Sequence, residues 1–392
     1  MRRQRWTLAS VATALTAVVL TGCGTNSAGT GASTVKVAVV YSRTGLLAAY
    51  GKNYVDGFKA GLDYATHGTG KAGGHTIEVT YADDAGNPAT AVDAAKQYIG
   101  DGYHILAGTV DSGIAAQLAP LAQQNRILYI SGPAATDTIT GINRYVFRSG
   151  RQTYQDVATA GSFIGDPTGK RVLVFAQDST FGQGNAAAVK AILGAKGAQV
   201  TQLLVPLTAT DFTPFARQAA QERADLIFVA WAGATTLPMW QALDQQQVLS
   251  STTVVTGLGN AASFAAYGPA TDKINFLSYY FPQATTNSVN AAMTTAIEKA
   301  GSSADLFSPD GFVAAQMIVH AVEQAGGDNV DAMIKALEGW TFDAPKGPQT
   351  IRAGDHAMLQ PMFQAKLVQH GATWEPEVVR VIPPAATAPR AA

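Results

Sequence analysis

The chain has 392 residues, and its 27 Lys and Arg residues nearly balance its 28 Asp and Glu residues. This balance argues against nucleic acid as the main partner, because binding to phosphates needs a clear basic excess. A composition of 47% hydrophobic and 14% charged residues excludes general disorder. The single cysteine excludes an internal disulfide and any site that needs several cysteines.

The first 22 residues have the pattern of an export signal. Arg2, Arg3 and Arg5 form a basic start, and an uncharged, mostly apolar stretch follows that is too short to span a bilayer. Leu20-Thr21-Gly22-Cys23 resembles the lipobox of bacterial lipoproteins. We therefore expect residues 1–22 to be a lipoprotein signal peptide, Cys23 to carry lipid and residues 23–34 to be a flexible linker. The alternative is an ordinary signal peptide with an incidental cysteine.

The expected location is extracytoplasmic, with the protein anchored to the cell membrane by lipid in a periplasm or on an outer face. The sequence leaves the envelope type open.

Short β-rich apolar runs alternate with Ala-rich helical patterns from about residue 34 onward, which predicts an α/β fold with parallel sheets. The expected strands are residues 35–41, 76–81, 104–107, 127–130, 171–176, 226–230 and 253–256. The expected helices are residues 51–65, 89–99, 112–124, 183–196, 212–222 and 237–246. The strands and helices form two series, which predicts two similar lobes. Because ligands bind beyond the carboxyl ends of such strands, we expect a cleft there.

Several segments, in order, resemble the type I periplasmic binding proteins of branched-chain amino acid ABC transporters. They include VKVAVVYSRTGLLAAYGKNYVDGFKAGLDYA, IEVTYADDAGNPATAVDAAKQYI, GTVDSG, YVFRSG, DSTFGQG and SPDGFVAAQMIVHAVEQAGG. The resemblance covers nearly all of residues 35–370. It implies two Rossmann-like lobes joined by a three-strand hinge. Lobe 1 would combine residues 35–149 with 284–345, and lobe 2 would combine 150–283 with 346–380. We expect residues 381–392 to form a disordered tail.

The resemblance implies a monomeric binding protein that is not an enzyme, needs no cofactor or metal, and does not bind nucleic acid. Its partners would be a small amino-acid-like solute and the permease and ATPase of an ABC importer, which would be separate chains. The solute would be a branched-chain amino acid or a related amide or acid. A sensor of the same fold that signals through a partner protein is the alternative.

Ser112 and Thr136 follow expected strands and precede helical or turn segments, where backbone N–H groups and hydroxyls can hold an anion. In the family that the chain resembles, these two loops bind the ligand carboxylate, also through backbone groups at the position of Ala134. The alternative is that both hydroxyls only cap helices.

Aromatic residues also follow expected strands or lie in nearby turns. Tyr50 and Phe181 match aromatic ligand contacts of the family, and Trp231 ends the strand LIFVAW at a position that often faces ligand. Tyr279 and Tyr280 are weaker candidates of the same kind. A purely core role is the alternative for each ring.

The match fails where an α-ammonium group would need a carboxylate. The family places an acid after the strand at 253–256, but this chain has Gly257-Leu258-Gly259-Asn260. Asp111, Asp178 or Asp310 are the possible substitutes, and the alternative for each is a solvated loop acid or a helix cap. Elsewhere, Arg148 is expected to face an anionic ligand or to form a salt bridge between lobes.

The patterns that would indicate an enzyme are weak. Residues 182–187 read G-x-G-x-x-A, but five residues separate this segment from the preceding strand and no acid ends the next strand, so a dinucleotide site is not expected. The six histidines show no zinc-binding spacing.

Overall fold

This computed structural model describes residues 33–391. The expected signal peptide, Cys23 and most of the expected linker lie outside the described residues. Residues 34–148 contribute a six-stranded sheet with the order β2-β3-β1-β4-β5-β6, parallel except where β2 pairs with β3. Its strands are β1 (Thr34–Tyr41), β2 (Lys71–Ala72), β3 (His75–Asp83), β4 (Ile105–Gly108), β5 (Leu128–Ser131) and β6 (Val146–Arg148).

The central strands of this sheet are continuous buried runs because helices cover them. All residues of β4 and β5 are buried, as is typical of parallel strands with both faces packed. The helices that accompany the sheet are α1 (Ala48–Ala65), α2 (Pro88–Gly100), α3 (Ser112–Asn125) and the short η1 (Asp137–Ile139). Asn87 caps α2 with its side chain, and Asp111 caps α3.

A seven-stranded sheet follows with the order β16-β15-β11-β10-β9-β7-β8. Its central strands are parallel, and β15 and β16 add an antiparallel edge. Its strands are β7 (Arg171–Gln177), β8 (Gln199–Val205), β9 (Leu226–Ala230), β10 (Thr253–Gly257), β11 (Ile274–Ser278), β15 (Met362–His370) and β16 (Thr373–Ile382). The accompanying helices are α4 (Thr153–Gly161), α5 (Thr180–Ile192), η2 (Gly194–Lys196), α6 (Thr213–Gln221), α7 (Thr236–Gln245), α8 (Val248–Ser251), η3 (Ala261–Lys273) and η4 (Pro282–Ala284).

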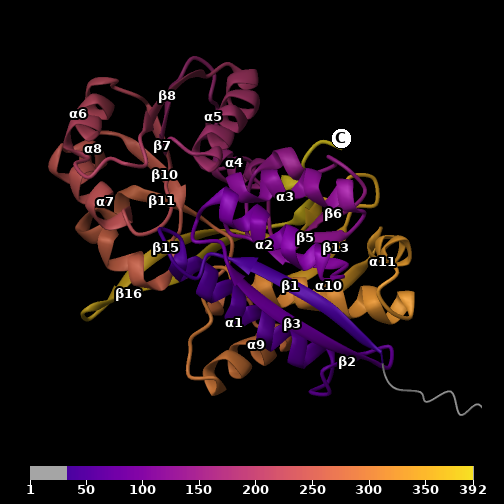
Figure 1. The fold of residues 1–392 in the computed structure, drawn as a ribbon. Helices are drawn as coiled ribbons and strands as arrows, with labels where there is room; N and C mark the ends of the chain where they lie inside the picture. Colours follow the sequence, from indigo (N-terminus) through magenta and orange to yellow (C-terminus); the bar gives the residue numbers. More distant parts are fainter. Residues whose placement is uncertain (1–32, 392) are drawn as a thin grey trace, which may run out of the picture. The chain divides into compact units, whose positions relative to one another are not determined.

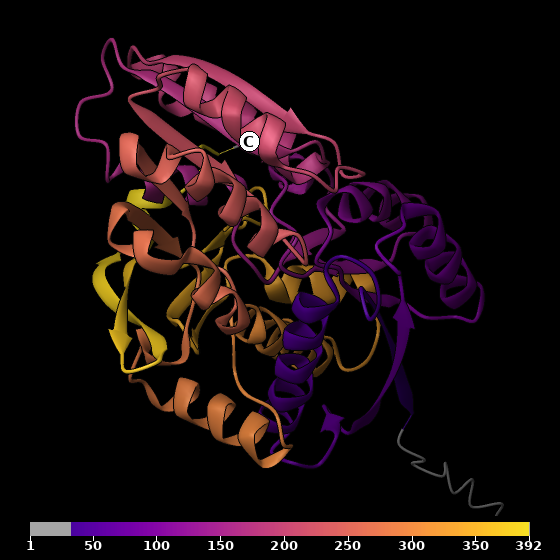
Figure 2. The ribbon, with the colours of Figure 1, turned by 90° about the vertical axis from the view of Figure 1, so that its left-hand side faces the viewer.

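Between β11 and β15 the chain returns to the first sheet. Helix α10 (Ser308–Ala325) packs along α1, and α9 (Ser288–Lys299) lies beside α1 in both views (Figures 1 and 2). The backbones of α1 and α10 touch, since a Cβ on Gly57 would lie 1.8 Å from the Ser308 carbonyl oxygen. The remaining elements are α11 (Val330–Leu337), the antiparallel strands β12 (Thr341–Ala344), β13 (Gly347–Ile351) and β14 (Met358–Leu359), and α12 (Pro384–Thr387).

The fold class is confirmed, since the chain is an α/β protein with two mostly parallel sheets. Each expected strand and helix is present within a few residues of its predicted bounds. The C-terminal residues differ from the expected disordered tail. Strand β16 runs to Ile382, Thr387 in α12 is buried, and the Arg352 guanidinium donates hydrogen bonds to the carbonyls of Pro389 and Arg390. Tertiary contacts therefore order a segment whose composition alone favours disorder.

Candidate functional site

A cavity of about 380 Å³ lies beyond the carboxyl ends of strands from both sheets. Its volume is within the range of roughly 300–1,000 Å³ that is typical of small-molecule sites. The segments that follow β4 and β5 supply one wall, and those that follow β7, β9, β10 and β11 supply the opposite wall. Leu46 and Leu47 before α1, Tyr50 in the first turn of α1, the turn after β3, and Leu306 and Phe307 before α10 also line it.

The start of α3 faces the cavity with two polar side chains. The Asp111 carboxylate caps the helix by accepting a hydrogen bond from the Ile114 N–H at 2.9 Å, and burial raises its pKa. The Ser112 Oγ accepts a hydrogen bond from the Thr136 N–H at 3.3 Å, and both Asp111 and Ser112 line the cavity. The Ser112 hydroxyl proton is available to a ligand, because no hydrogen bond within residues 33–391 uses it.

The start of α5 approaches the same place from the second sheet. Ser179 caps α5, and Ser179, Thr180 and Phe181 line the cavity. The two helix starts lie close together, since a Cβ on Gly113 would lie 3.2 Å from the Thr180 Oγ1. Two helix N-termini with free hydroxyls therefore converge on one end of the cavity, which favours an anionic group there.

Ala134 and Thr136 are not among the lining residues, although their neighbours Pro133 and Ala135 are. Both are fully buried, and the Thr136 Oγ1 caps η1 by accepting from the Thr138 N–H at 3.3 Å. The loop after β5 thus contributes alternate residues to the cavity, and the capping alternative describes the Thr136 side chain.

Arg148 does neither of the things expected of it. Its guanidinium donates to the carbonyls of Ala134 at 2.6 Å and Thr136 at 3.3 Å and to the Thr140 Oγ1 at 2.7 Å. It does not line the cavity and forms no salt bridge within the described residues. Burial lowers its pKa to about 10. Arg148 therefore stabilises the loop after β5 from the side that faces away from the cavity.

Three of the predicted rings line the cavity. Tyr50 packs edge-on against Phe307 at 5.1 Å between centroids, and its hydroxyl accepts from the Gly233 N–H at 3.4 Å. Phe181 is half-buried on α5. Trp231 lines the cavity and also stacks on Phe175 at 5.6 Å, so it serves both the wall and the core.

The two adjacent tyrosines after β11 face opposite ways. Tyr279 lines the cavity and stacks against Phe307 at 5.8 Å. Tyr280 is buried elsewhere, and its hydroxyl donates to the Asn290 Oδ1 at 2.7 Å. Alternation along extended backbone explains the difference.

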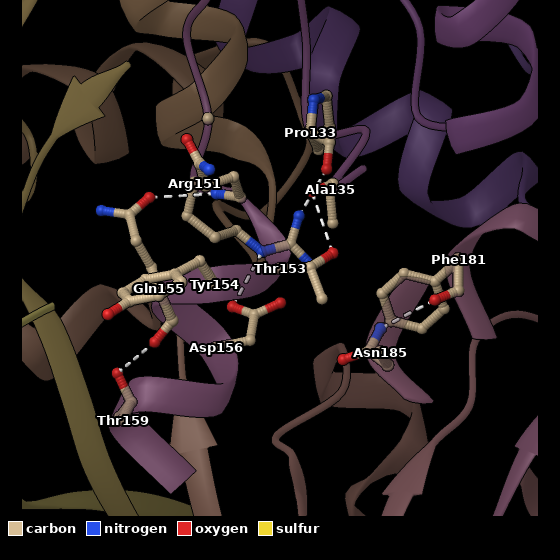
Figure 3. A network of polar contacts seen from close by, with 12 residues as sticks. Pro133, Ala135, Arg151, Thr153, Tyr154, Gln155, Asp156, Thr159, Phe181 and Asn185 are labelled. Carbon is tan, nitrogen blue, oxygen red and sulfur yellow. Dashed lines mark hydrogen bonds and ion pairs between the residues drawn. The ribbon is translucent and has the colours of Figure 1, made fainter. Parts of the chain in front are cut away.

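Sequence reasoning missed a buried ion pair in the cavity wall. The Arg151 Nε donates to the Asp156 Oδ1 at 3.3 Å, and the Arg151 guanidinium also bonds the Pro133 carbonyl (Figure 3). The same guanidinium lies 3.8 Å from the centroid of the Tyr279 ring, a cation–π contact. Burial raises the pKa of Asp156 to about 6, although Arg151 opposes that shift. The sequence feature that could have indicated this ion pair is the second arginine of Arg148-Ser149-Gly150-Arg151.

The other acids do not reach the cavity. Asp178 accepts a hydrogen bond from Gln183 at 2.7 Å and is not a lining residue. Asp310 is buried on α10, and burial raises its pKa to about 6 while Lys346 opposes the shift. Asn260 is not a lining residue either, whereas Gly257, Leu258 and Gly259 are.

Among residues 33–391, no group of three or more His, Cys, Asp or Glu side chains is arranged to hold a metal ion. No helix in that part of the chain combines the length and the apolar character needed to cross a bilayer.

Comparisons with known proteins agree with this geometry. The pattern of a family described as periplasmic binding protein matches residues 34–372. A Leu/Ile/Val-binding protein homolog 3 of Brucella melitensis is 27% identical over 315 residues, which cover 77% of this chain and 83% of the relative. A solved ABC-type branched-chain amino acid transporter structure from Rhodopseudomonas palustris is 33% identical with a TM-score of 0.73, covering 90% of this chain and 97% of that chain.

A second solved structure is a solute-binding protein of an ABC transporter from R. palustris in complex with 4-hydroxybenzoate. It is 24% identical with a TM-score of 0.82, covering 90% of this chain and 97% of that chain, and this likeness shows the fold.

Proposed function

From the premise that this chain belongs to the periplasmic binding protein family, we propose that it binds a small apolar amino-acid-like solute in the cavity between its two sheets. The chain is a solute-binding protein of an ABC transporter and not an enzyme. The preferred solute class is a branched-chain amino acid or a related amide or acid. The solved structure of an ABC-type branched-chain amino acid transporter at 33% identity supports this class.

The residues that line the cavity are the main support for this proposal. Helix starts with free hydroxyls, at Ser112 and Thr180, stand at one end, and buried or half-buried rings form the walls. The helix starts suit a carboxylate, and the rings suit an apolar side chain.

We expect binding to be coupled to closure of two lobes, residues 35–149 with 284–345 and residues 150–283 with 346–380. Two hydrogen bonds already link the opposite sides of the cavity mouth, from the Ala234 N–H to the Leu46 carbonyl at 3.1 Å and from the Gly233 N–H to the Tyr50 hydroxyl. A ligand that contacts both sides only in the closed form would shift a hinge equilibrium toward it. Lipid on Cys23 would hold the protein beside a permease and an ATPase formed by separate chains.

Thermal unfolding of a protein that begins at Ala32 tests the proposed function. The protein would be heated alone and with amino acids, amides, polyamines and aromatic acids. A ligand at 100 times its Kd adds about 2.7 kcal/mol, which raises Tm by a few degrees. A rise with leucine, isoleucine or valine supports the proposal, whereas a rise only with polyamines, or with none of these compounds, contradicts it.

A further inference from the structure

The cavity wall formed by β10 offers no charged acceptor to a cationic group. Gly257, Leu258 and Gly259 line it, and none has a polar side chain. Within residues 33–391, the acidic side chains that line the cavity are Asp111 and Asp156. An ammonium group would therefore have to use one of these two carboxylates, because a buried unpaired charge is costly.

The Asp156 carboxylate is held with one oxygen free. The residue is 2% exposed, its Oδ1 receives the Arg151 Nε, and its Oδ2 has no hydrogen-bond partner. The Arg151 guanidinium bonds the Pro133 carbonyl through Nη1 and lies over the Tyr279 ring, and it makes no hydrogen bond to this Oδ2. Buried polar atoms are nearly always paired, so the free oxygen calls for a donor.

A second free acceptor stands opposite on α5. Asn185 is 1% exposed, lines the cavity and donates its Nδ2 to the Phe181 carbonyl at 2.9 Å, which leaves its Oδ1 without a partner in the described part of the chain. Figure 3 shows the Asp156 carboxylate and the Asn185 amide on facing sides of the same space. The two acceptors come from α4 and α5, which pack together.

We infer that Asp156, assisted by Asn185, receives the α-ammonium group of an apolar amino acid bound in this cavity. The inference rests on the proposed function and names its ligand as a zwitterion. The local charges favour this class, because Arg151 already balances Asp156. A ligand with no net charge leaves that balance intact, while its own carboxylate lies at the starts of α3 and α5.

Asp111 is the less suitable acceptor. Its Oδ1 is committed to the Ile114 N–H, and its negative charge is already stabilised by the N-terminus of α3. An Asp111→Asn variant removes the charge and keeps a good helix cap, so it is a matched control for Asp156→Asn.

The test compares two probes, L-leucine and 4-methylpentanoate, which is leucine without its amino group. Titration calorimetry would measure both affinities for the wild type, Asp156→Asn and Asp111→Asn. We expect Asp156→Asn to weaken leucine binding on the order of 10- to 100-fold and not to weaken 4-methylpentanoate binding, because the Arg151 charge that it leaves unbalanced attracts an anion. We expect Asp111→Asn to leave the ratio of the two affinities unchanged.

The outcomes separate this inference from the proposed function. If no probe of the amino acid, amide or acid panel binds the wild type, both fail. If the wild type binds 4-methylpentanoate or benzoate but not leucine, or if Asp111→Asn alone changes the ratio, only this inference fails. Should Asp156→Asn not fold, Asn185→Leu replaces it, and an unchanged leucine affinity in that variant overturns the inference.

Discussion

The two walls of the cavity are built in different ways. The wall from the first sheet presents the Asp111 carboxylate and the Ser112 hydroxyl, and hydrogen bonds behind it from Arg148 and Arg151 fix the backbone of the loop after β5. The wall on the side of the second sheet combines polar groups of α4 and α5, such as Asp156, with rings such as Trp231, which is anchored by stacking in the core. Polar recognition depends on exact placement of donors and acceptors, whereas apolar recognition depends mainly on shape and area. Changes to the polar residues and to the arginine behind them should therefore have larger effects than changes to the rings.

The largest effect is expected from Arg148→Leu. The change leaves the buried carbonyls of Ala134 and Thr136 and the Thr140 hydroxyl without their donor, and each unpaired group costs about 1–3 kcal/mol. We expect the free energy of unfolding in urea to fall by about 3–5 kcal/mol. Arg144→Leu, at an exposed arginine, is the control and should change stability by less than about 1 kcal/mol. Equal stability of the two variants would show that the hydrogen bonds from Arg148 do not stabilise the loop after β5.

Gly233→Ala should break the contact across the cavity mouth. Gly233 has φ +84°, and an added Cβ would lie 2.5 Å from the Leu46 carbonyl oxygen. Gly165→Ala is the matched control, because it has φ +66° with nothing within 4 Å. Both variants should lose about 1 kcal/mol of stability from backbone strain. Only Gly233→Ala should also weaken leucine binding, about 10-fold or more, as measured by calorimetry. Equal affinities would mean that this contact plays no part in binding.

Leucine binding should weaken as the pH falls below about 6. Burial raises the pKa of Asp156 from 3.8 to about 6, and only the ionised carboxylate attracts an ammonium group. Binding should therefore weaken up to about tenfold per pH unit below that value. The charged groups that face Asp156 are Arg151 before α4, Asp137 on η1 and Lys346 between β12 and β13. Asp156→Asn should remove this dependence, and a wild-type affinity that is constant from pH 7 to 5 would contradict the assignment.

The raised pKa of Asp156 has the opposite effect on the stability of the ligand-free protein, which it favours at low pH. The fold favours the protonated form of Asp156, so this contribution to stability is fully present below pH 3.8 and is lost as the pH rises through about 6. Asp310 acts in the same direction over the same range. Urea unfolding of the wild type and Asp156→Asn across this range separates the Asp156 contribution.

The smallest effects are expected from single hydroxyl deletions. Ser112→Ala removes a hydroxyl whose proton is free at the cavity and should weaken leucine binding by about 1 kcal/mol, with a smaller loss of stability because the Thr136 N–H loses its acceptor. Thr136→Ala removes the cap of η1 and should instead lower stability by about 1 kcal/mol. Calorimetry and urea unfolding of both variants check this contrast. If Thr136→Ala weakens binding as much as Ser112→Ala does, then Thr136 takes part in ligand binding and its role is not limited to capping η1.

The sequence by itself determined the order of strands and helices and the polar or aromatic residues that follow each strand. Tyr50, Ser112, Phe181 and Trp231 could be found in this way, because a strand end is a local pattern and parallel strands place their ends at one edge.

Only the tertiary structure decided which of two nearby arginines reaches the cavity. Arg148 and Arg151 are three residues apart, yet the first turns back to the loop after β5 and the second pairs with Asp156. Nothing local distinguishes them, because the outcome depends on where β5, α4 and α5 meet in space. The Asp156 Oδ2 is likewise a feature of the tertiary structure, because burial and the absence of a hydrogen-bond partner within the described residues are not visible in a local sequence pattern.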